Sequence, residues 1–218
     1  MESATEIEQV GGVPESLWQR IRAEPDRAPE HIALAAADRF APQAEEWVRV
    51  AGGGHTPKSL AKTAYRKHVR LARLEGATLG LGGFWTAAPD LVALVWIQCR
   101  MVFFIAAAHG YDPRHPMRPA ELLALQDVYP TAAEARDAFD GVGKRMAQAM
   151  VERALVSKRD QSLTRRLAKY AGKRVAQRYA GRLIPLIGSP IGAVQNAAVT
   201  KELGKKALAY YGGDQARP

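Results

Sequence analysis

The chain has 218 residues, 47% of them hydrophobic, and a formal net charge of +9, so it has enough apolar material for one domain with a substantial core. Its single cysteine, Cys99, excludes an internal disulfide and lies in an apolar segment, where a small core residue is expected. Alanine is abundant and β-branched alternation is scarce, which favours an all-α class over folds built on sheets.

The charge is distributed unevenly along the chain. Residues 1–46 carry 4 basic and 10 acidic side chains, whereas residues 141–218 carry 16 basic and 4 acidic ones. A basic C-terminal third suits anionic lipid head groups or nucleic acid, or serves solubility alone. The acidic segment 1–12 lacks the basic and apolar regions of a secretory signal, which predicts a cytoplasmic protein.

The first 50 residues predict a lead-in followed by helices. Residues 1–30 are rich in proline and acidic side chains, and we expect a loosely ordered, loosely docked region with a helical turn or two near residues 14–18. Over residues 31–51 the apolar positions fit one or two helices broken near Pro42. The three glycines at 52–54 are expected to end them.

A basic amphipathic helix is predicted from Thr56, as N-cap, to Glu75, with Pro57 in its first turn. Its basic side chains have two main interpretations, a solvated face of a globular helix or a helix that lies on an anionic membrane surface. Binding to a partner helix is a third interpretation. The candidates for contact with lipid head groups in this helix are Lys62, Arg66, Lys67 and Arg70.

A glycine-rich stretch follows this helix. Gly76, Gly80, Gly82 and Gly83 provide either a hinge or, through the four-residue spacing of the first two, a place where another helix approaches closely. No Lys-Ser/Thr pair follows them and no GxGxxG register is completed, so a phosphate-binding loop is disfavoured.

The most apolar segment, from Pro89 to His109, predicts one helix with Asp90 beside its positive N-terminal dipole and Gly110 as its stop. Its length of about 30 Å would cross a bilayer. Arg100 near its middle would cost about 2.5–3.5 kcal/mol at a bilayer centre, so a conventional transmembrane anchor is not favoured. Arg100 needs a partner from elsewhere, because Asp90 lies about 15 Å away along the helix axis.

Three possible metal ligands follow the apolar helix. His109, Asp112 and His115 are spaced three apart, which suggests a metal site. Gly110 and Pro113 prevent them from projecting from one helical face, and no fourth ligand is evident. An ordinary loop is therefore favoured, and we expect neither a metal nor a cofactor.

Two short helices are expected over residues 119–129 and 131–140, and a long helical region begins at Gly143. The second half of that region is strongly basic. Aromatic residues rarely interleave with its basic ones, and no helix-turn-helix or zinc spacing accompanies it, so nucleic acid is disfavoured as a partner. Further candidates for contact with lipid head groups are Lys169, Lys173, Arg174 and Arg178.

A second apolar segment, interrupted by glycine and proline, covers residues 183–200. Gly188 and Gly192 have the spacing of small residues at a close helix contact, and Asn196 lies one turn further along. A buried Asn needs hydrogen-bond partners. Asn196 could satisfy a carbonyl of a broken helix, meet Arg100 or Asp90 across a helix contact, or lie on the surface of the final helix.

The two apolar segments together resemble the EcsC family of bacterial proteins. The first family motif is met by Gly80–Gly83, Pro89–Val92, Cys99–Val102 and His109–Asp112, with Val92 where proline is usual and His109 where tyrosine is usual. The second, Ile-Pro-x-Ile-Gly-x-x-Ile-Gly-Ala-x-x-Asn, is met over residues 184–196. The resemblance implies a helical protein whose namesake is encoded beside an ABC transporter. It implies membrane proximity rather than an activity.

Our preferred hypothesis is an all-α multi-helix bundle with two apolar segments broken by glycine and proline, formed by an EcsC-like domain over residues 31–212 and followed by a tail over 213–218. It attaches to the inner face of the cell membrane through the apolar segments 79–108 and 183–200 and the flanking basic helices. The expected partners are an anionic membrane surface and a membrane protein, in an accessory role in transport without catalysis. The alternative is a soluble helical enzyme or ligand binder with a pocket formed by Asp90, Arg100 and Asn196.

Overall fold

The computed structural model describes residues 12–78, 87–139 and 189–213. These residues form helices and no strand, which confirms the all-α class. Residues 132–139 are also helical. The labelled elements in chain order are α2 (Glu15–Ala23), the 3-10 helix η1 (Pro25–Arg27), α3 (Ala28–Ala51), α4 (Pro57–Thr78), α5 (Ala87–Ala108), α6 (Arg118–Leu125) and α10 (Ser189–Gly212).

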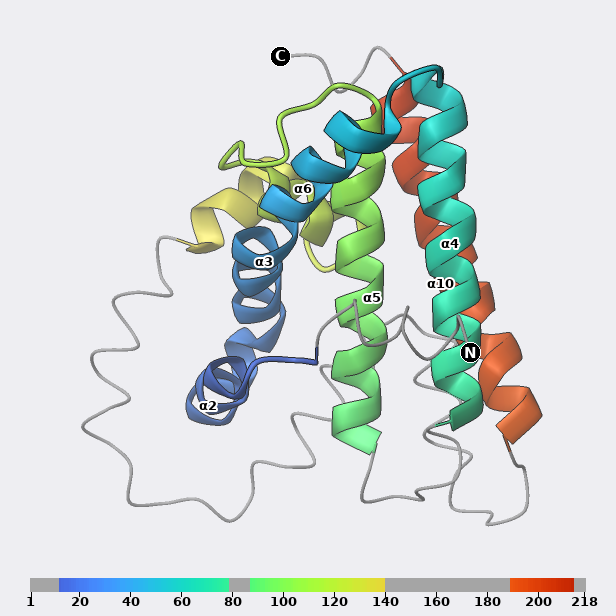
Figure 1. The fold of residues 1–218 in the computed structure, drawn as a ribbon. Coiled ribbons are helices and arrows are strands. Elements are labelled where there is room, and N and C mark those ends of the chain that lie inside the picture. Colours follow the sequence, from blue (N-terminus) through green and yellow to red (C-terminus); the bar gives the residue numbers. More distant parts are fainter. Residues whose placement is uncertain (1–11, 79–86, 140–188, 214–218) are drawn as a thin grey trace.

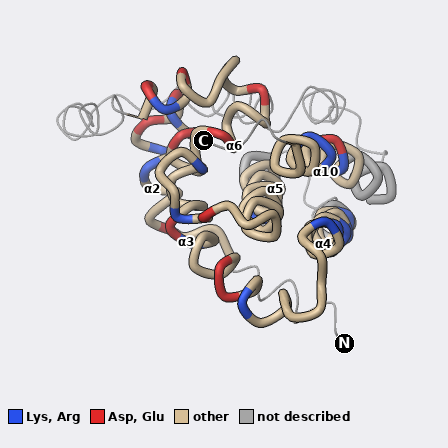
Figure 2. Tube along the Cα trace, turned by 90° about the horizontal axis from the view of Figure 1, so that it is seen from above, with Lys and Arg blue, Asp and Glu red and all other residues tan. Residues whose placement is uncertain are grey.

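The apolar helix α5 lies at the centre of the bundle (Figures 1 and 2). Helix α3 packs along one side of it, and α4 and α10 lie side by side along the other. Helix α4 runs antiparallel to α5, whereas α10 runs parallel to it (Figure 1). The segment Leu91–Ala108 is long and apolar enough to cross a membrane, with a mean hydropathy of 2.1, but 94% of it is buried inside the protein. In this fold it is therefore the core helix.

Local signals place the helix ends where the sequence predicts them. The backbone N–H of Ser59 donates to the Thr56 hydroxyl over 3.2 Å, so Thr56 is the N-cap of α4. At the C-terminal end of α5, Gly110 has a φ of +86° and its N–H donates to the carbonyl of Ala107 over 2.9 Å. This left-handed glycine ends the helix, which confirms the predicted stop.

Helix α3 continues through Pro42, so the predicted break at that residue is wrong. A proline inside a helix removes one backbone hydrogen bond and costs about 3 kcal/mol. Packing on both sides of Pro42 offsets this cost. The ring of Phe40 lies 4.7 Å from that of Trp96 in α5, and the ring of Trp47 lies 5.2 Å from that of Phe104.

The described part of the N-terminal region is packed more firmly than the predicted lead-in. Leu17 and Ile21 of α2 are fully buried. The carboxylate of Glu30 accepts a hydrogen bond from the Tyr129 hydroxyl and one of 3.1 Å from Nη1 of Arg27. Residues 15–30 are thus attached to the bundle, while residues 1–11 lie outside the described residues.

Helix α6 is shorter than the helix predicted over residues 119–129. It ends at Leu125, and Asp127 adopts a φ of +56° shortly afterwards. Aspartate is one of the few residues other than glycine that tolerates this left-handed conformation. The chain turns there and becomes helical again at residue 132, close to the predicted start of the next helix.

Gly204 allows α10 to approach its neighbours closely. A Cβ atom at this position would lie 2.4 Å from Cδ2 and 2.7 Å from Cε2 of Tyr65 in α4, and 3.1 Å from Sδ of Met101 in α5. These distances are too short for a methyl group. The contact between α10 and the rest of the bundle therefore depends on the absence of a side chain at residue 204.

We expect the substitution Gly204→Ala to lower the free energy of unfolding. Alanine gains about 1 kcal/mol of helix propensity over glycine, but overpacking a core typically costs about 1–3 kcal/mol. The net loss, measured by urea denaturation, should reach about 2 kcal/mol. Gly53→Ala is the control, since no atom lies within 4 Å of its Cβ position. A stability gain from Gly204→Ala would show that Tyr65 moves aside at little cost.

Candidate functional site

Two of the three residues of the predicted polar site lie inside the bundle. Arg100 and Asn196 are 8% and 5% exposed. Nε2 of Gln98 in α5 donates to the Thr200 hydroxyl of α10 over 3.4 Å, which fixes the register of the two parallel helices. Asn196 lies four residues before Thr200 and Arg100 two residues after Gln98, so about 9 Å separates them along the helix axes.

Asp90 belongs to the first turns of α5, but its side chain lies outside the described residues. Convergence of Asp90, Arg100 and Asn196 on one pocket therefore stays a prediction. Within the described residues, Arg100 stacks on the ring of Phe104, with its guanidinium carbon 4.8 Å from the ring centroid. These two residues are one helical turn apart, so the cation finds part of its environment on its own helix.

His68 of α4 is a buried polar residue that the sequence analysis overlooked. It is completely buried, and its Nδ1 donates to the carbonyl of Ala64 over 2.7 Å. Burial lowers the pKa of His68 to about 3, and the charge of Arg100 contributes in the same direction. His68 is therefore neutral near pH 7. Its helical spacing from Leu60, Ala64 and Leu71 places it on the apolar face and could have identified it.

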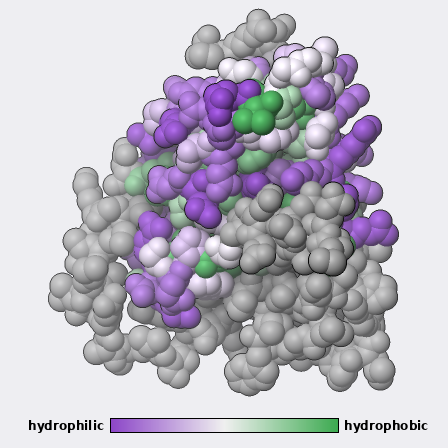
Figure 3. Space-filling model, viewed as in Figure 1, coloured by the Kyte–Doolittle hydropathy of each residue, from purple (hydrophilic) through white to green (hydrophobic). Residues whose placement is uncertain are grey.

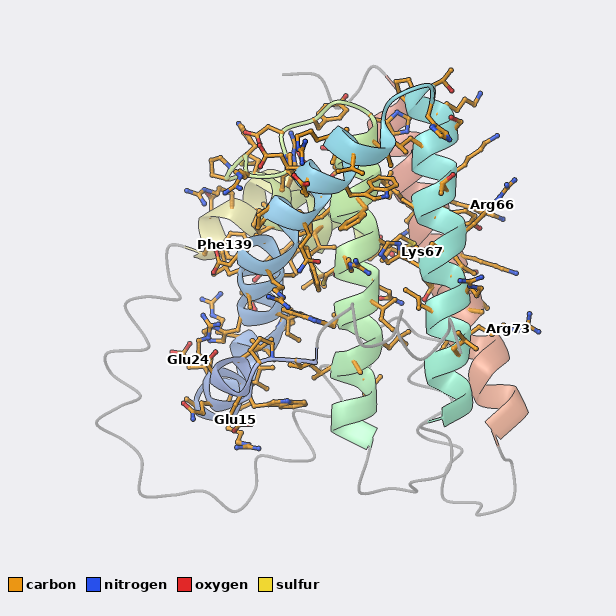
Figure 4. The ribbon with its side chains drawn as sticks, in the orientation of Figure 1. Glu15, Glu24, Arg66, Lys67, Arg73 and Phe139 are labelled. Atoms are coloured by element: carbon orange, nitrogen blue, oxygen red, sulfur yellow. The ribbon has the colours of Figure 1, made fainter. Side chains whose placement is uncertain are left out.

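The outer side of α4 carries a row of cations, which we call the basic face. Between Pro57 and Leu74 the sequence contains six basic residues and no acidic one. In Figure 4 Arg66 and Arg73 point away from the bundle, while Lys67 lies between α5 and α4 and is half-buried. The exposed residues that form the basic face are Lys58, Lys62, Arg66, Arg70 and Arg73.

The basic face continues onto the neighbouring helix α10. Figure 2 shows the blue segments of α4 and α10 on the side of the bundle away from α3. The described surface over α4 is correspondingly hydrophilic in Figure 3. Lys201 and Lys205 of α10 are exposed, Glu202 adds one negative charge between them, and Lys206 is paired with Asp127 over 2.5 Å. The face is thus predominantly, though not uniformly, positive.

The remaining predicted candidates lie outside the described residues or show only their backbone. Gly192 lies in the first turns of α10, whereas Gly80, Gly82, Gly83 and Gly188 are not described. The basic candidates of the long helical region, Lys169, Lys173, Arg174 and Arg178, are also not described.

Two polar side chains of the loop after α5 accept hydrogen bonds from backbone N–H groups of the same loop. Oδ1 of Asp112 accepts a hydrogen bond of 2.8 Å from the backbone N–H of Arg114. Nδ1 of His115 accepts one of 3.3 Å from the backbone N–H of Met117. Among the described residues, no three His, Cys, Asp or Glu side chains are grouped as metal ligands. Both side chains therefore have a structural role in the loop.

The family model described as EcsC protein family matches residues 55–212, which is well over half of the chain. A segment of 55 residues is 34% identical to the "Uncharacterized protein YdbA" of Bacillus subtilis (strain 168), and covers 25% of this chain and 20% of YdbA. The match therefore spans about a fifth of that relative's length. No solved structure matches the chain significantly.

The family match begins one residue before the N-cap of α4. Helices α2 and α3 precede the matched range, although α3 packs directly against α5. The matched range contains the central helix α5, the helix pair α4 and α10, and both of the motifs in the apolar segments. On this match, the chain belongs to the EcsC protein family.

Proposed function

We propose that this protein binds peripherally to an anionic membrane surface at the cytoplasmic side, with the basic face of α4 against the lipid head groups. The observation that carries the proposal is the row of exposed cations on this helix, which no acidic residue interrupts between Pro57 and Leu74. Four of the cations recur every four residues, at 58, 62, 66 and 70, so they follow one side of the helix.

The fold favours electrostatic attachment over insertion. An interfacial helix that inserts buries its apolar face among the lipid chains. In α4 that face is occupied, because Leu60, Ala64 and Leu71 are buried in the bundle. Each basic residue near an anionic membrane contributes about 1 kcal/mol of attraction, so five exposed cations suffice for reversible binding. This attraction should weaken strongly as salt concentration rises.

The first apolar segment forms the core of the bundle, so the proposed attachment does not depend on it. The described part of segment 79–108 is enclosed by α3, α4, α6 and α10, so it is not available to lipid in this fold. The alternative function, an enzyme or ligand binder with a pocket at Asp90, Arg100 and Asn196, stays a prediction, because the side chain of Asp90 lies outside the described residues. An accessory role beside a membrane transporter remains the expectation from the family resemblance.

The test is cosedimentation with vesicles of phosphatidylglycerol and phosphatidylcholine at low and high salt. The protein should bind the anionic vesicles at low salt and be released at high salt, and it should not bind pure phosphatidylcholine vesicles. The triple variant Lys58→Gln, Lys62→Gln and Arg66→Gln should bind roughly 100-fold more weakly, since three contacts of about 1 kcal/mol are lost.

The matched control removes three positive charges from residues outside the basic face. Arg39, Arg49 and Arg136 are exposed on α3 and on residues 132–139, and their replacement by Gln also lowers the net charge by three. This control should bind vesicles almost as well as the unaltered protein. Equal losses in the two triple variants would contradict a specific basic face. Tight binding of duplex DNA in a mobility-shift assay at physiological salt, without vesicle binding, would favour nucleic acid instead.

A further inference from the structure

A cleft of about 590 Å³ opens at the end of the bundle where α4 begins and α5 and α10 end. The loop after α5, which lines this cleft, is at the upper end of the bundle in Figure 1. This loop includes the His-Gly-Tyr-Asp sequence at residues 109–112. The lining residues that carry polar groups relevant to binding are His109, Tyr111, Asp112, His115, Arg118 and Tyr211.

Arg118 is held in a fixed position at this cleft. It is 7% exposed. Its Nε donates to the carbonyl of Asp112 over 3.0 Å and its Nη1 forms an ion pair with Glu121. Its guanidinium carbon lies 5.1 Å from the ring centroid of Tyr111 and 5.7 Å from that of Tyr211. The carbonyl of Asp112 and the carboxylate of Glu121 engage Nε and Nη1, and Tyr211 also forms a side-chain hydrogen bond with the guanidinium, so Nη2 is the amino group least used within the protein.

The carboxylate of Glu121 is occupied on the inner side of Arg118. It accepts a hydrogen bond of 2.8 Å from the Tyr211 hydroxyl in addition to the ion pair. Burial raises the pKa of Tyr211 well above its usual value, and the charge of Glu121 adds to the effect, so this hydroxyl stays protonated and donates. Glu121 is not among the residues that line the cleft. It therefore orients Arg118 from outside the cleft, and its negative charge offsets part of the positive charge that Arg118 presents to an anionic ligand.

The cleft offers further donors and one carboxylate. Nδ1 of His115 accepts from the backbone N–H of Met117, so the ring hydrogen is on Nε2, which is a second donor. Oδ1 of Asp112 is used by the backbone N–H of Arg114, which leaves Oδ2 as an acceptor. Burial lowers the pKa of His109, so this ring stays neutral, and its Nε2 has no hydrogen-bond partner among the described residues. A fixed cation and a carboxylate thus line the same cleft.

We propose that this cleft binds a phosphate group that carries a neighbouring hydroxyl or ammonium group. Arg118 and His115 bind the phosphate oxygens, since a guanidinium presents its donors in the geometry that suits phosphate. Asp112 accepts from the hydroxyl or ammonium group, which distinguishes such a ligand from inorganic phosphate. The volume is in the range of small-ligand sites.

The cleft also adjoins the basic face. Pro57 lines the cleft, and Lys58, the first cation of the basic face, is the next residue of α4. A membrane surface that meets the basic face therefore presents its phosphate head groups at the rim of the cleft. The inference that the phosphate belongs to a lipid head group rests on the proposed function, whereas the inference that the cleft binds a soluble phosphate ester does not.

The test is calorimetric titration of the full chain with inorganic phosphate and with phosphoethanolamine, which joins a phosphate to an ammonium group. The unaltered protein should bind phosphoethanolamine more tightly. Asp112→Asn keeps the acceptor for the Arg114 N–H but removes the charge, so it should weaken phosphoethanolamine binding about tenfold and tighten phosphate binding. His115→Ala removes an exposed side chain and should weaken both about three- to tenfold.

The control is Asp127→Asn, the same substitution at an exposed carboxylate that pairs with Lys206 elsewhere. It should leave both affinities unchanged. Absence of saturable binding of either compound, or an equal change of both affinities in Asp112→Asn, would overturn the cleft assignment. Binding of the soluble compounds without binding to anionic vesicles would uphold the cleft and refute the proposed function. Salt-sensitive binding to vesicles, without binding of either soluble compound, would uphold the proposed function and refute the cleft assignment.

Discussion

Replacement of Phe40 by alanine should lower the free energy of unfolding by about 3–5 kcal/mol, the usual cost of removing a buried aromatic side chain. Phe40 is completely buried and its ring packs 4.7 Å from that of Trp96. No neighbouring helix can fill the space easily, because α3 is held in place by the Trp47 and Phe104 contact further along. Urea denaturation of the full chain measures the change.

The control for this prediction is Val50→Ala on the same helix. Val50 is 68% exposed, so its truncation should change stability by no more than about 0.5 kcal/mol. A large effect at Phe40 would show that α3 is part of the same core as α5, even though the family match begins at residue 55. A loss at Phe40 as small as that at Val50 would mean that α3 contributes little to the core.

Local sequence signals account for the parts of the fold that were predicted correctly. Thr56 and Pro57 define the start of α4, and Gly110 defines the end of α5. Both signals are local, because an N-cap and a glycine in the left-handed conformation depend only on neighbouring residues. Arg100 was expected to need a partner from elsewhere in the chain, and the structure adds a contact with Phe104, four residues away on its own helix. Such short-range contacts are readable from spacing.

Long-range packing explains what the sequence did not predict. Pro42 is a strong local signal for a break, but contacts between α3 and α5 override it. The contact between Tyr211 and Glu121 joins residues 90 positions apart, and no periodicity indicates it. The sequence favoured an ordinary loop around His109 and Asp112, and only the tertiary structure associates this loop with Arg118 and Tyr211.

The second large effect is expected at the buried ion pair between Arg118 and Glu121. Glu121→Leu removes the carboxylate and leaves the guanidinium buried without a counter-ion, which typically costs about 3–5 kcal/mol. The Tyr211 hydroxyl loses its acceptor as well. Urea denaturation should show this loss. Glu46→Leu is the control, since Glu46 forms an exposed pair with Arg49 at the same spacing and its loss should leave the unfolding midpoint almost unchanged.

A double variant separates stability from function at this pair. Arg118→Met combined with Glu121→Leu replaces both charges by apolar side chains, and buried pairs replaced in this way often keep or gain stability. We expect the double variant to recover most of the stability lost in Glu121→Leu and to lose phosphoethanolamine binding. That result would mean that the pair serves to orient a cation at the cleft. A double variant as unstable as the single one would instead assign the pair a structural role, with its tyrosine contacts contributing directly to the fold.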